Sequence, residues 1–280
     1  MITSLKNPLV RRVATLRDKR RSRETLRQFL IEGDRELYHA VQGGVVIEQL
    51  FFCPELLTDN QHFNCQEQID SIIQSGHNLD KRNQPSQSLV EVSPQVYARI
   101  ACREKVEGLV AVARQPEFSL ADLKLPPQPL LLVVQGLEKP GNLGALLRTA
   151  DAVGVDAVLV CDAQLDLYNP NVIRSSLGAI FTLPVLAVTL AEAVDWLENH
   201  NIQIILSSPS ATMDHTDADY TLPVAVVLGS EKQGLPPQWL QQPVCQVKIP
   251  MQGKMDSLNV SVSGAVILYE VLRQRKLAQK

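Results

Sequence analysis

Polar side chains that donate and accept hydrogen bonds open an otherwise apolar segment late in the chain; they are Ser257, Asn259, Ser261 and Ser263. The apolar residues that follow, 265–269, predict a helix that is buried on most of its sides. The start of such a helix carries unpaired backbone N–H groups and the positive end of the helix dipole, so it requires polar partners. Ser257 is the predicted N-cap, and residues 249–253 are a predicted tight loop before it.

A capped helix after a turn would account for this pattern if it stood alone. A second polar loop, however, occurs earlier in the chain. An apolar run over residues 130–134 predicts a buried strand, and the turn-rich loop 136–142 follows it. Apolar residues at helical spacing then predict a helix capped by Asn142. Arg148 lies on this helix. Taken alone, it would be an ordinary charged residue on a solvent-exposed helix face.

A third segment has the same organisation as the second. The apolar run 224–228 predicts a buried strand, which ends at the glycine-rich loop 229–234 with one acidic residue, Glu231. A single glycine-rich loop is weak evidence for any function. No Gly-x-Gly-x-x-Gly follows a predicted strand, which disfavours an oxidoreductase with a dinucleotide cofactor.

In this order, the three segments resemble the SpoU/TrmH family of RNA ribose 2′-O-methyltransferases, within the SPOUT superfamily. The matching residues are Asn142, Gly144 and Arg148 in the first, Gly229, Glu231 and Gly234 in the second, and Ile249, Pro250, Met251, Ser257, Leu258, Asn259 and Ser261 in the third. Residues 169–178 also look like the family. One departure is Lys139 before Pro140, where many members carry an acid; it leaves Asn142 and Arg148 in place.

The resemblance implies a fold and a cofactor. The family has a deep trefoil knot at its C-terminal end, an exception to the rule that chains do not thread. It forms homodimers through this domain, with an active site shared across the interface. S-adenosylmethionine is expected in the knot, held largely by backbone groups near Gly229, Ile249 and Leu258. Backbone groups can read the polar edge of adenine, while Leu258 and Ile249 pack on its ring.

The resemblance also implies site residues and a reaction. The acceptor would be a ribose 2′-hydroxyl, which must lose its proton during attack. A guanidinium stays protonated, so Arg148 is expected to position a substrate phosphate and stabilise developing charge rather than act as the base. Asn142 is expected to orient Arg148 or the ribose, and Ser257 and Asn259 to shape the site. Glu231 either holds its loop or acts directly.

The elements that would position these residues form an α/β domain. Strands are predicted at residues 130–134, 157–160, 202–206, 224–228 and 244–248. Their alternation with helical segments predicts a mostly parallel sheet with helices on both faces. Ligands of such sheets bind beyond the carboxyl ends of the strands, and both glycine-rich loops and the loop at Ile249 follow predicted strands directly.

A proline-rich segment, 115–128, predicts a linker between a domain over residues 1–114 and one over 129–280. The first would be a small α/β domain, and residues 32–37 resemble the RNA-binding domain of many family members. Its predicted elements are strands at 29–33, 45–52 and 110–113, a helix at 34–42 and a helix that starts with Ser93 and Pro94. Residues 59–87 are expected to be variable surface structure, with a mobile loop at 83–88.

Basic residues crowd the start of the chain, although its formal net charge is -3. Residues 1–35 contain ten Lys and Arg but only four Asp and Glu, which favours contact with a polyanion. Such phosphate contacts would be salt-sensitive and independent of sequence. A salt-bridged exposed helix is the alternative. The predicted RNA-binding residues are Arg11, Arg12, Arg17, Arg20, Arg21 and Arg23.

Composition favours a cytoplasmic protein with neither metal nor membrane partner. The five cysteines are scattered and the five histidines lack metal-ligand spacing. The sequence contains neither an apolar run long enough to span a bilayer nor a secretory signal. Ribosomal RNA is the expected substrate, because similar architectures act there; transfer RNA is the first alternative. A non-catalytic RNA-binding assembly factor is the second, disfavoured by the intact set of site residues.

Overall fold

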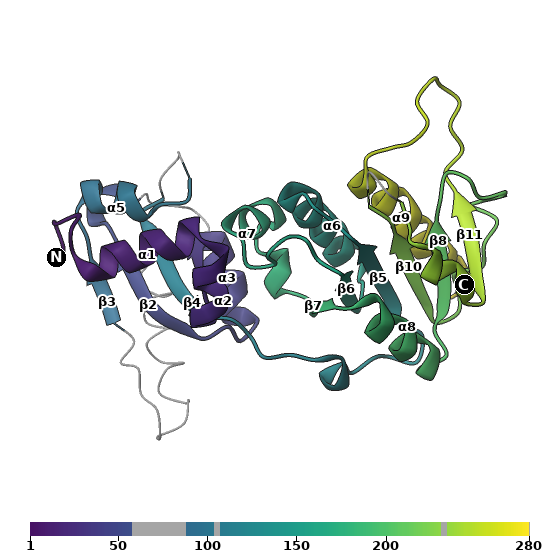
Figure 1. The fold of residues 1–280 in the computed structure, drawn as a ribbon, viewed down its shortest axis with the longest axis horizontal. Helices are drawn as coiled ribbons and strands as arrows, with labels where there is room; N and C mark the ends of the chain where they lie inside the picture. The colour runs from purple at the N-terminus through teal and green to yellow at the C-terminus, as the bar shows by residue number, and fades with distance from the viewer. Residues whose placement is uncertain (58–87, 104–106, 231–233, 280) are drawn as a thin grey trace. The chain divides into compact units, whose positions relative to one another are not determined.

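The computed structural model describes residues 1–57, 88–103, 107–230 and 234–279 (Figure 1). These divide into two compact units. The N-terminal unit comprises Met1–Glu117 and Tyr168–Thr182, and the C-terminal unit comprises Phe118–Leu167 and Leu183–Lys280. The N-terminal unit is therefore discontinuous in sequence, which the division at residues 115–128 did not anticipate. The predicted mobile loop at 83–88 falls almost entirely outside the described residues.

A four-stranded mixed sheet in the order β1-β4-β2-β3 forms the centre of the N-terminal unit. Its strands are β1 (Gln28–Glu32), β2 (Ile47–Phe52), β3 (Ser88–Glu91) and β4 (Leu109–Arg114). Strand β4 runs antiparallel to β1 and β2, and β3 is parallel to β2. The helices are α1 (Pro8–Asp18), α2 (Arg20–Leu26), α3 (Asp34–Gln42), α5 (Pro94–Ile100) and α7 (Pro170–Ser176), with short turns η1 (Pro54–Leu56) and η4 (Ala179–Phe181).

Apolar residues at helical spacing attach α1 to this sheet. Asn7 caps the helix, and Pro8 occupies its first turn. Val10, Val13 and Leu16 are buried against α5 and the sheet. The segment Tyr168–Thr182 joins the same unit through aromatic packing on β1: the Phe29 ring lies 4.6 Å from that of Tyr168 and 5.9 Å from that of Phe181.

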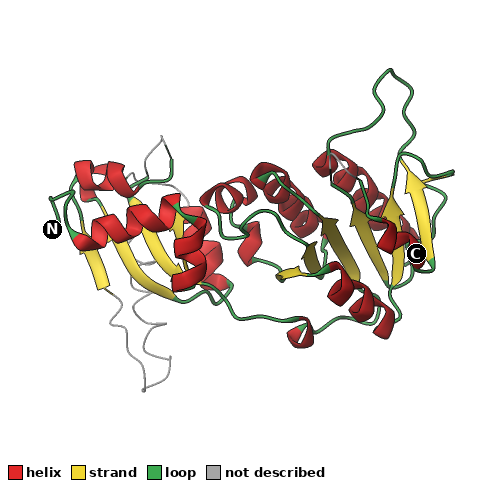
Figure 2. Cartoon of the chain, viewed as in Figure 1, coloured by secondary structure: helices red, strands yellow, loops and turns green. Residues whose placement is uncertain are grey.

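A seven-stranded sheet in the order β7-β6-β5-β10-β8-β11-β9 forms the C-terminal unit (Figure 2). All its pairings between described strands are parallel, which confirms the predicted α/β class. The strands are β5 (Leu130–Gln135), β6 (Ala157–Cys161), β7 (Val185–Val188), β8 (Gln203–Ser207), β9 (Met213–Asp214), β10 (Val224–Leu228) and β11 (Val244–Lys248). The helices are α6 (Pro140–Val153), α8 (Leu190–Asn199) and α9 (Val260–Ala278), with short turns η3 (Leu120–Asp122) and η5 (Pro237–Gln241).

Alternate strand residues point to opposite faces of a sheet, and helices cover both faces here. Helix α8 packs on the face that carries Leu131 and Val227. Helices α6 and α9 pack together on the other face, where Gly264 lies against Leu146 and Leu228. The latter part of the predicted linker packs on the α8 face through Leu120, Leu123 and Leu125.

Helix α9 is buried along one side only. Val262, Tyr269 and Leu277 are roughly half exposed, so the prediction of burial on most sides is wrong within a single chain. No helix in the described part of the protein has the length and apolar character needed to cross a membrane.

Candidate functional site

A pocket of about 520 Å³ opens at the carboxyl ends of β8, β10 and β11. Beyond β8 it is lined by Ser208, beyond β10 by Gly229 and Ser230, and beyond β11 by Ile249. Residues 256–260, which lead into α9, also line it. This is the edge at which parallel sheets bind ligands, and we call this cavity the first pocket.

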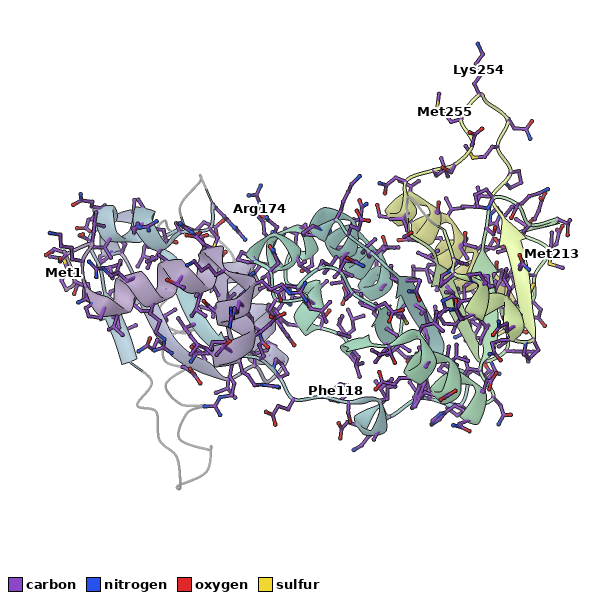
Figure 3. All side chains as sticks on the ribbon, in the orientation of Figure 1. Met1, Phe118, Arg174, Met213, Lys254 and Met255 are labelled. Carbon is purple, nitrogen blue, oxygen red and sulfur yellow. The ribbon has the colours of Figure 1, made fainter. Side chains whose placement is uncertain are left out.

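Five predicted site residues meet in the first pocket: Gly229, Ile249, Ser257, Leu258 and Asn259. They come from two strand ends and the approach to α9, so the fold brings together segments that are distant in sequence. The loop between β11 and α9 extends outward beyond them, with Lys254 and Met255 at its tip (Figure 3). Sequence reasoning missed Ser208 and Lys139, which also line this pocket; Ser208 stands in no recognisable motif, and Lys139 was noted only as a departure from the first one.

Asn259, rather than Ser257, caps α9. Its Oδ1 accepts hydrogen bonds from the Ser261 backbone N–H at 2.9 Å and from the Ser261 hydroxyl at 2.7 Å. Its Nδ2 donates to Asn142 Oδ1 at 3.3 Å. The prediction for Ser257 is corrected accordingly: this residue precedes the helix and lines the pocket.

Asn142 also differs from its predicted role as a cap. Lys139 occupies the N-cap position of α6 without a side-chain capping hydrogen bond, and the helix begins at Pro140. Proline fits the first helical turn, because its missing N–H costs nothing there. Asn142 therefore lies inside the first turn, and its side chain reaches Asn259. This contact joins the starts of α6 and α9 beside the first pocket.

The turn after β10 leaves no room for a side chain at its first residue. A Cβ on Gly229 would come within 2.6 Å of the Gly234 carbonyl carbon, closer than packed atoms approach. Ser230 and Gly234 close the turn through two backbone hydrogen bonds of 3.0 and 3.1 Å. Glu231 lies between them, outside the described residues.

Arg148 is exposed on α6 and is not among the residues that line the first pocket. It follows Asn142 by six residues, which places it about 9 Å further along the helix and on a different face. The guanidinium and the Asn142–Asn259 contact therefore occupy separate parts of one chain's surface.

The predicted RNA-binding arginines fall into three groups. Arg11 and Arg21 are exposed. Arg12, Arg17 and Arg20 each pair with a neighbouring side chain: Arg12 with Gln28, Arg17 with Asp18, and Arg20 with Glu24. Thus part of the basic segment follows the salt-bridged alternative. The Arg20–Glu24 pair is exposed on both sides and therefore weak. The Arg17 side chain is only 23% exposed and also donates to the carbonyl oxygens of Arg99 and Ala101.

Arg23 corrects the predicted set. It is only 2% exposed, and its guanidinium donates to the carbonyl oxygens of Leu16 and Arg17 at the end of α1. It therefore anchors the α1–α2 junction and does not reach an RNA backbone. No sequence signal distinguished it from its neighbours, because this burial is a tertiary effect.

No metal or redox centre is evident in the part of the chain that the structure describes. Its four described cysteines are free, and burial raises the pKa of the Cys161 thiol to about 12. No group of three or more His, Cys, Asp or Glu side chains among the described residues could hold a metal ion.

Comparisons with known proteins give matches in both parts of the chain. Residues 129–269 match the SpoU rRNA Methylase family, and residues 7–111 match the MRM3-like substrate binding domain. An uncharacterized tRNA/rRNA methyltransferase of Synechocystis is 32% identical over 277 residues, which cover 98% of this chain and 94% of the relative.

Solved structures are similar over nearly the whole chain. The crystal structure of an RNA 2′-O ribose methyltransferase has a TM-score of 0.79 at 42% identity and covers 98% of this chain and 99% of its own. The SpoU methyltransferase AviRb from Streptomyces viridochromogenes, in complex with AdoMet, has a TM-score of 0.82 at 25% identity, with coverage of 97% and 100%.

Proposed function

Because the chain belongs to the SpoU/TrmH family of RNA methyltransferases, we propose that it methylates a ribose 2′-hydroxyl of RNA, with ribosomal RNA as the substrate. S-adenosylmethionine is its cofactor and supplies the methyl group. The observation that carries the proposal is the hydrogen bond between Asn142 and Asn259, which unites two of the three motifs beside the first pocket. The similar structure described as an RNA 2′-O ribose methyltransferase supports the choice of acceptor.

The first pocket has the chemistry that a nucleoside cofactor needs. Ile249 and Leu258 supply apolar surface for the adenine ring. The tight turn at Gly229 brings backbone groups to the pocket without an intervening side chain, so that they can bind the polar edge of the ring. Ser257 and Asn259 add polar side chains at the same wall.

Arg148 is the proposed catalytic cation. Its planar guanidinium donates up to five hydrogen bonds and stays protonated, so it would hold a phosphate of the acceptor nucleotide and stabilise the negative charge that develops on the 2′-oxygen. The proton of the hydroxyl would pass to that phosphate or to water. Asn142 and Asn259 would fix the starts of the two helices that frame the site, and Glu231 would support the turn after β10.

A second copy of the chain would bring Arg148 to a pocket. Arg148 lies outside the first pocket of its own chain, and α9, whose start lines that pocket, carries the exposed apolar residues Val262 and Tyr269. A homodimer through the C-terminal domain would cover these side chains and complete the site. The trefoil knot that the family implies is part of the same proposal, and it would form where α9 packs on α6 and β10.

Residues 1–114 would bind the RNA, 115–128 would link the domains, and 129–280 would carry the methyltransferase. The match to the MRM3-like substrate binding domain supports the first assignment, and the exposed Arg11 and Arg21 would contact phosphates. Transfer RNA is the alternative substrate, since the Synechocystis relative is described as a tRNA/rRNA methyltransferase. The cytoplasm is the proposed location.

Transfer of radiolabelled methyl groups to size-fractionated RNA from a strain lacking this gene tests the proposal. Label in large ribosomal RNA is expected. Arg148→Ala should lower the rate about 10²–10³-fold, while Lys124→Ala, an exposed cation of the same unit, should leave it unchanged. Label in transfer RNA would overturn the substrate, and cofactor binding without label in any fraction would favour an assembly factor. Full activity of Arg148→Lys would exclude a role specific to the guanidinium fork.

Mixing two inactive variants tests the shared site. If Arg148 acts on the pocket of its partner, dimers that combine Arg148→Ala with Asn259→Ala contain one intact site and recover activity. If activity recovers neither in the mixture nor in a co-expressed pair, the result contradicts the dimeric arrangement.

A further inference from the structure

A second, larger pocket of about 850 Å³ lies on the other side of the turn after β10. It opens at the carboxyl ends of β5 and β6 and at the start of α8. Ser230 and Gly234 line both pockets, and the consecutive residues Glu138 and Lys139 line the second and the first respectively. Ligands bound in the two pockets would therefore be neighbours, separated by one turn and one loop.

The floor of the second pocket is held by a chain of hydrogen bonds. Gln135 is 6% exposed; its amide nitrogen donates to Asp162 at 2.9 Å, and its oxygen accepts from Trp239 Nε1 at 3.1 Å. Asp162 also accepts from the Leu190 backbone N–H at 3.4 Å. These contacts link the ends of β5 and β6 to the start of α8 and to η5. They fix the Asp162 carboxylate before any ligand arrives, as a specific site requires.

The described lining of this pocket suits a nucleobase better than a phosphate. None of the described residues that line it is basic, and two are acids, Glu138 and Asp162. Amide and hydroxyl groups add further donors and acceptors, and Pro236, Pro237 and Leu190 supply apolar surface. A nucleobase is flat and uncharged, with donors and acceptors along its edge, and proteins bind unstacked bases through such edges and faces.

We propose that the second pocket binds the base of the acceptor nucleotide while its ribose faces the first pocket, an assignment that rests on the proposed function. The carboxylates would accept hydrogen bonds from an exocyclic amino group, as Asp and Glu do with cytosine N4. Uracil presents a carbonyl oxygen at the same position, which a carboxylate repels. The subsite therefore selects bases that carry an amino group and rejects uracil.

Cytidine and uridine form a matched pair of probes, because their bases differ in the group at position 4 and its neighbouring proton. Saturation-transfer difference NMR on the full chain, with the first pocket filled by S-adenosylhomocysteine, measures each nucleoside alone. Cytidine is expected to bind about tenfold more tightly than uridine. Asp162→Asn and Glu138→Gln should each reduce this preference, while Glu198→Gln, an exposed acid elsewhere on α8, should preserve it.

Asp162→Asn can disturb the fold, because Asp162 accepts a hydrogen bond from Gln135 in the pocket floor. Glu138 is exposed on its loop, so Glu138→Gln tests the subsite without that effect. Equal binding of both nucleosides, or an unchanged preference in Glu138→Gln, would overturn the subsite. These results are independent of methyl transfer. If the chain methylates RNA but does not distinguish the nucleosides, only the subsite proposal is overturned. If it selects cytidine but transfers no methyl group, only the proposed activity is overturned.

The acceptor position supplies a second test once the methylated nucleotide is mapped. Transcripts with each of the four bases at that position should show the lowest kcat/KM for uracil, about tenfold below the best amino-bearing base. Glu138→Gln should narrow this ratio, because an amide donates to the uracil carbonyl. Equal kcat/KM values for all four transcripts would contradict the proposal.

Discussion

The two units bury different kinds of side chain. The interior of the N-terminal unit includes Glu32, Glu36 and Arg23, each 4% exposed or less. In the C-terminal unit, β5 and β10 are buried at every position, and apart from Gln135 at the end of β5 their residues are apolar. Polar groups gather instead beyond the strand ends, where both pockets open.

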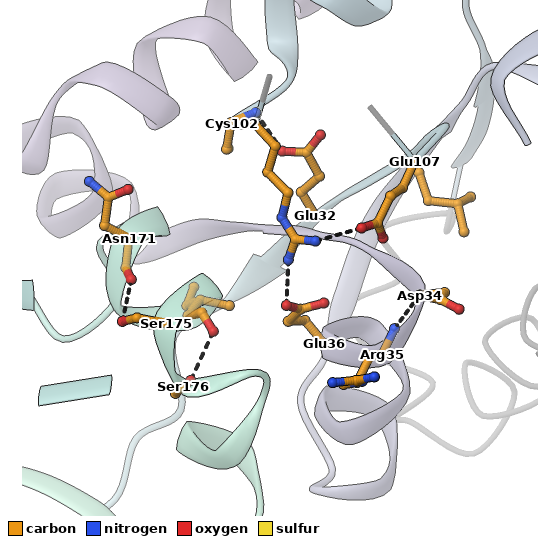
Figure 4. A network of polar contacts seen from close by, with 12 residues as sticks. Glu32, Asp34, Arg35, Glu36, Cys102, Glu107, Asn171, Ser175 and Ser176 are labelled. Carbon is orange, nitrogen blue, oxygen red and sulfur yellow. Dashed lines mark hydrogen bonds and ion pairs between the residues drawn. The ribbon is translucent and has the colours of Figure 1, made fainter. Parts of the chain in front are cut away.

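Figure 4 shows what the buried charges of the N-terminal unit do. Arg103 forms ion pairs with Glu36 and, at 2.7 Å, with Glu107. The Glu32 carboxylate accepts hydrogen bonds from the Cys102 backbone N–H and, at 3.1 Å, from the Tyr97 hydroxyl. These contacts connect β1, α3 and the segment after α5, so buried polar pairs add to the apolar packing of this unit, whereas β5 and β10 of the other unit bury almost only apolar side chains.

The largest predicted effect breaks this network. Arg103→Leu leaves the buried Glu36 without its cation, and loss of one partner of a buried pair costs about 3–5 kcal/mol. Hydrogen exchange of β1 and β4 should report this loss of unfolding free energy. Both tryptophans, Trp196 and Trp239, lie in the C-terminal unit, so their fluorescence should report no comparable change.

Arg114→Ala is the matched control for that experiment. Its pair with Glu48 lies nearer the surface, with the arginine side chain 54% exposed and the glutamate 13%. Pairs with an exposed partner contribute up to about 1 kcal/mol. Equal losses in Arg103→Leu and Arg114→Ala would contradict the view that buried pairing holds this unit together.

The second prediction concerns the apolar interior of the C-terminal unit. A Cβ on Gly264 would lie 2.5 Å from Leu146 Cδ2 and 2.8 Å from Leu228 Cδ1. Since both leucines are buried, Gly264→Ala should overpack the interface of α6, α9 and β10 and cost about 1–3 kcal/mol. Urea unfolding followed by tryptophan fluorescence measures this cost.

Gly141→Ala, in helix α6 of the same helix pair, should change the free energy of unfolding in the opposite direction. No atom lies within 4 Å of a Cβ at Gly141, and alanine stabilises a helical position by roughly 0.5–1 kcal/mol relative to glycine. A lower unfolding midpoint for Gly141→Ala would show that the sensitivity is not due to close packing at Gly264.

The third prediction compares two helix caps. Asn259→Ala and Asn7→Ala each remove a side chain that accepts from a first-turn N–H, of Ser261 and Leu9 respectively. Each should cost about 1 kcal/mol of stability. Only Asn259→Ala should also weaken binding of S-adenosylhomocysteine, measured calorimetrically, because Asn259 lines the first pocket. Equal affinities of the two variants for S-adenosylhomocysteine would show that the Asn259 side chain does not contribute to cofactor binding.

The elements best predicted from sequence are those with clear local boundaries. The predicted helix at 34–42 and the strands at 224–228 and 244–248 agree with α3, β10 and β11, because glycine or proline flanks each of them. Strand β9 was not predicted, since two residues carry no periodicity. The cap of α9 was misplaced because Ser257 and Asn259 are both good capping residues, and only the path of the chain decides between them.

Tertiary contacts set the remaining limits. The burial of Arg23 and the grouping of Tyr168–Thr182 with the N-terminal unit depend on contacts between segments distant in sequence. The residues that line the first pocket were named through the resemblance of three ordered segments to a known family, and not through local periodicity. The second pocket lacked any such motif: its floor pairs Gln135 with Trp239, 104 residues apart.

The smallest predicted effect is a difference in the direction of pH dependence. Burial raises the pKa of Glu32 and of Glu36 in the folded protein. Their contribution to stability is therefore complete below the unfolded pKa of about 4.5 and is lost as pH rises through the higher folded values. In the C-terminal unit, hydrogen bonding to Arg273 lowers the pKa of Glu270, so its contribution is present above the unfolded pKa and is lost on acidification.

Amide hydrogen exchange between pH 4 and 7, corrected for intrinsic rates, resolves the two units separately. The hydrogen bond to Arg17 lowers the pKa of the exposed carboxylate Asp18. Such groups make the stability of the N-terminal unit rise with pH, weakly because solvent screens them. The decisive comparison is therefore between the wild type and a variant. Glu36→Gln cannot ionise, and it should lose less stability than the wild type as pH rises, in the N-terminal unit alone. Identical slopes in Glu36→Gln and the wild type would show that solvent reaches this carboxyl. The proposed difference between the interiors of the two units would then not hold for Glu36, the most buried acid among the described residues.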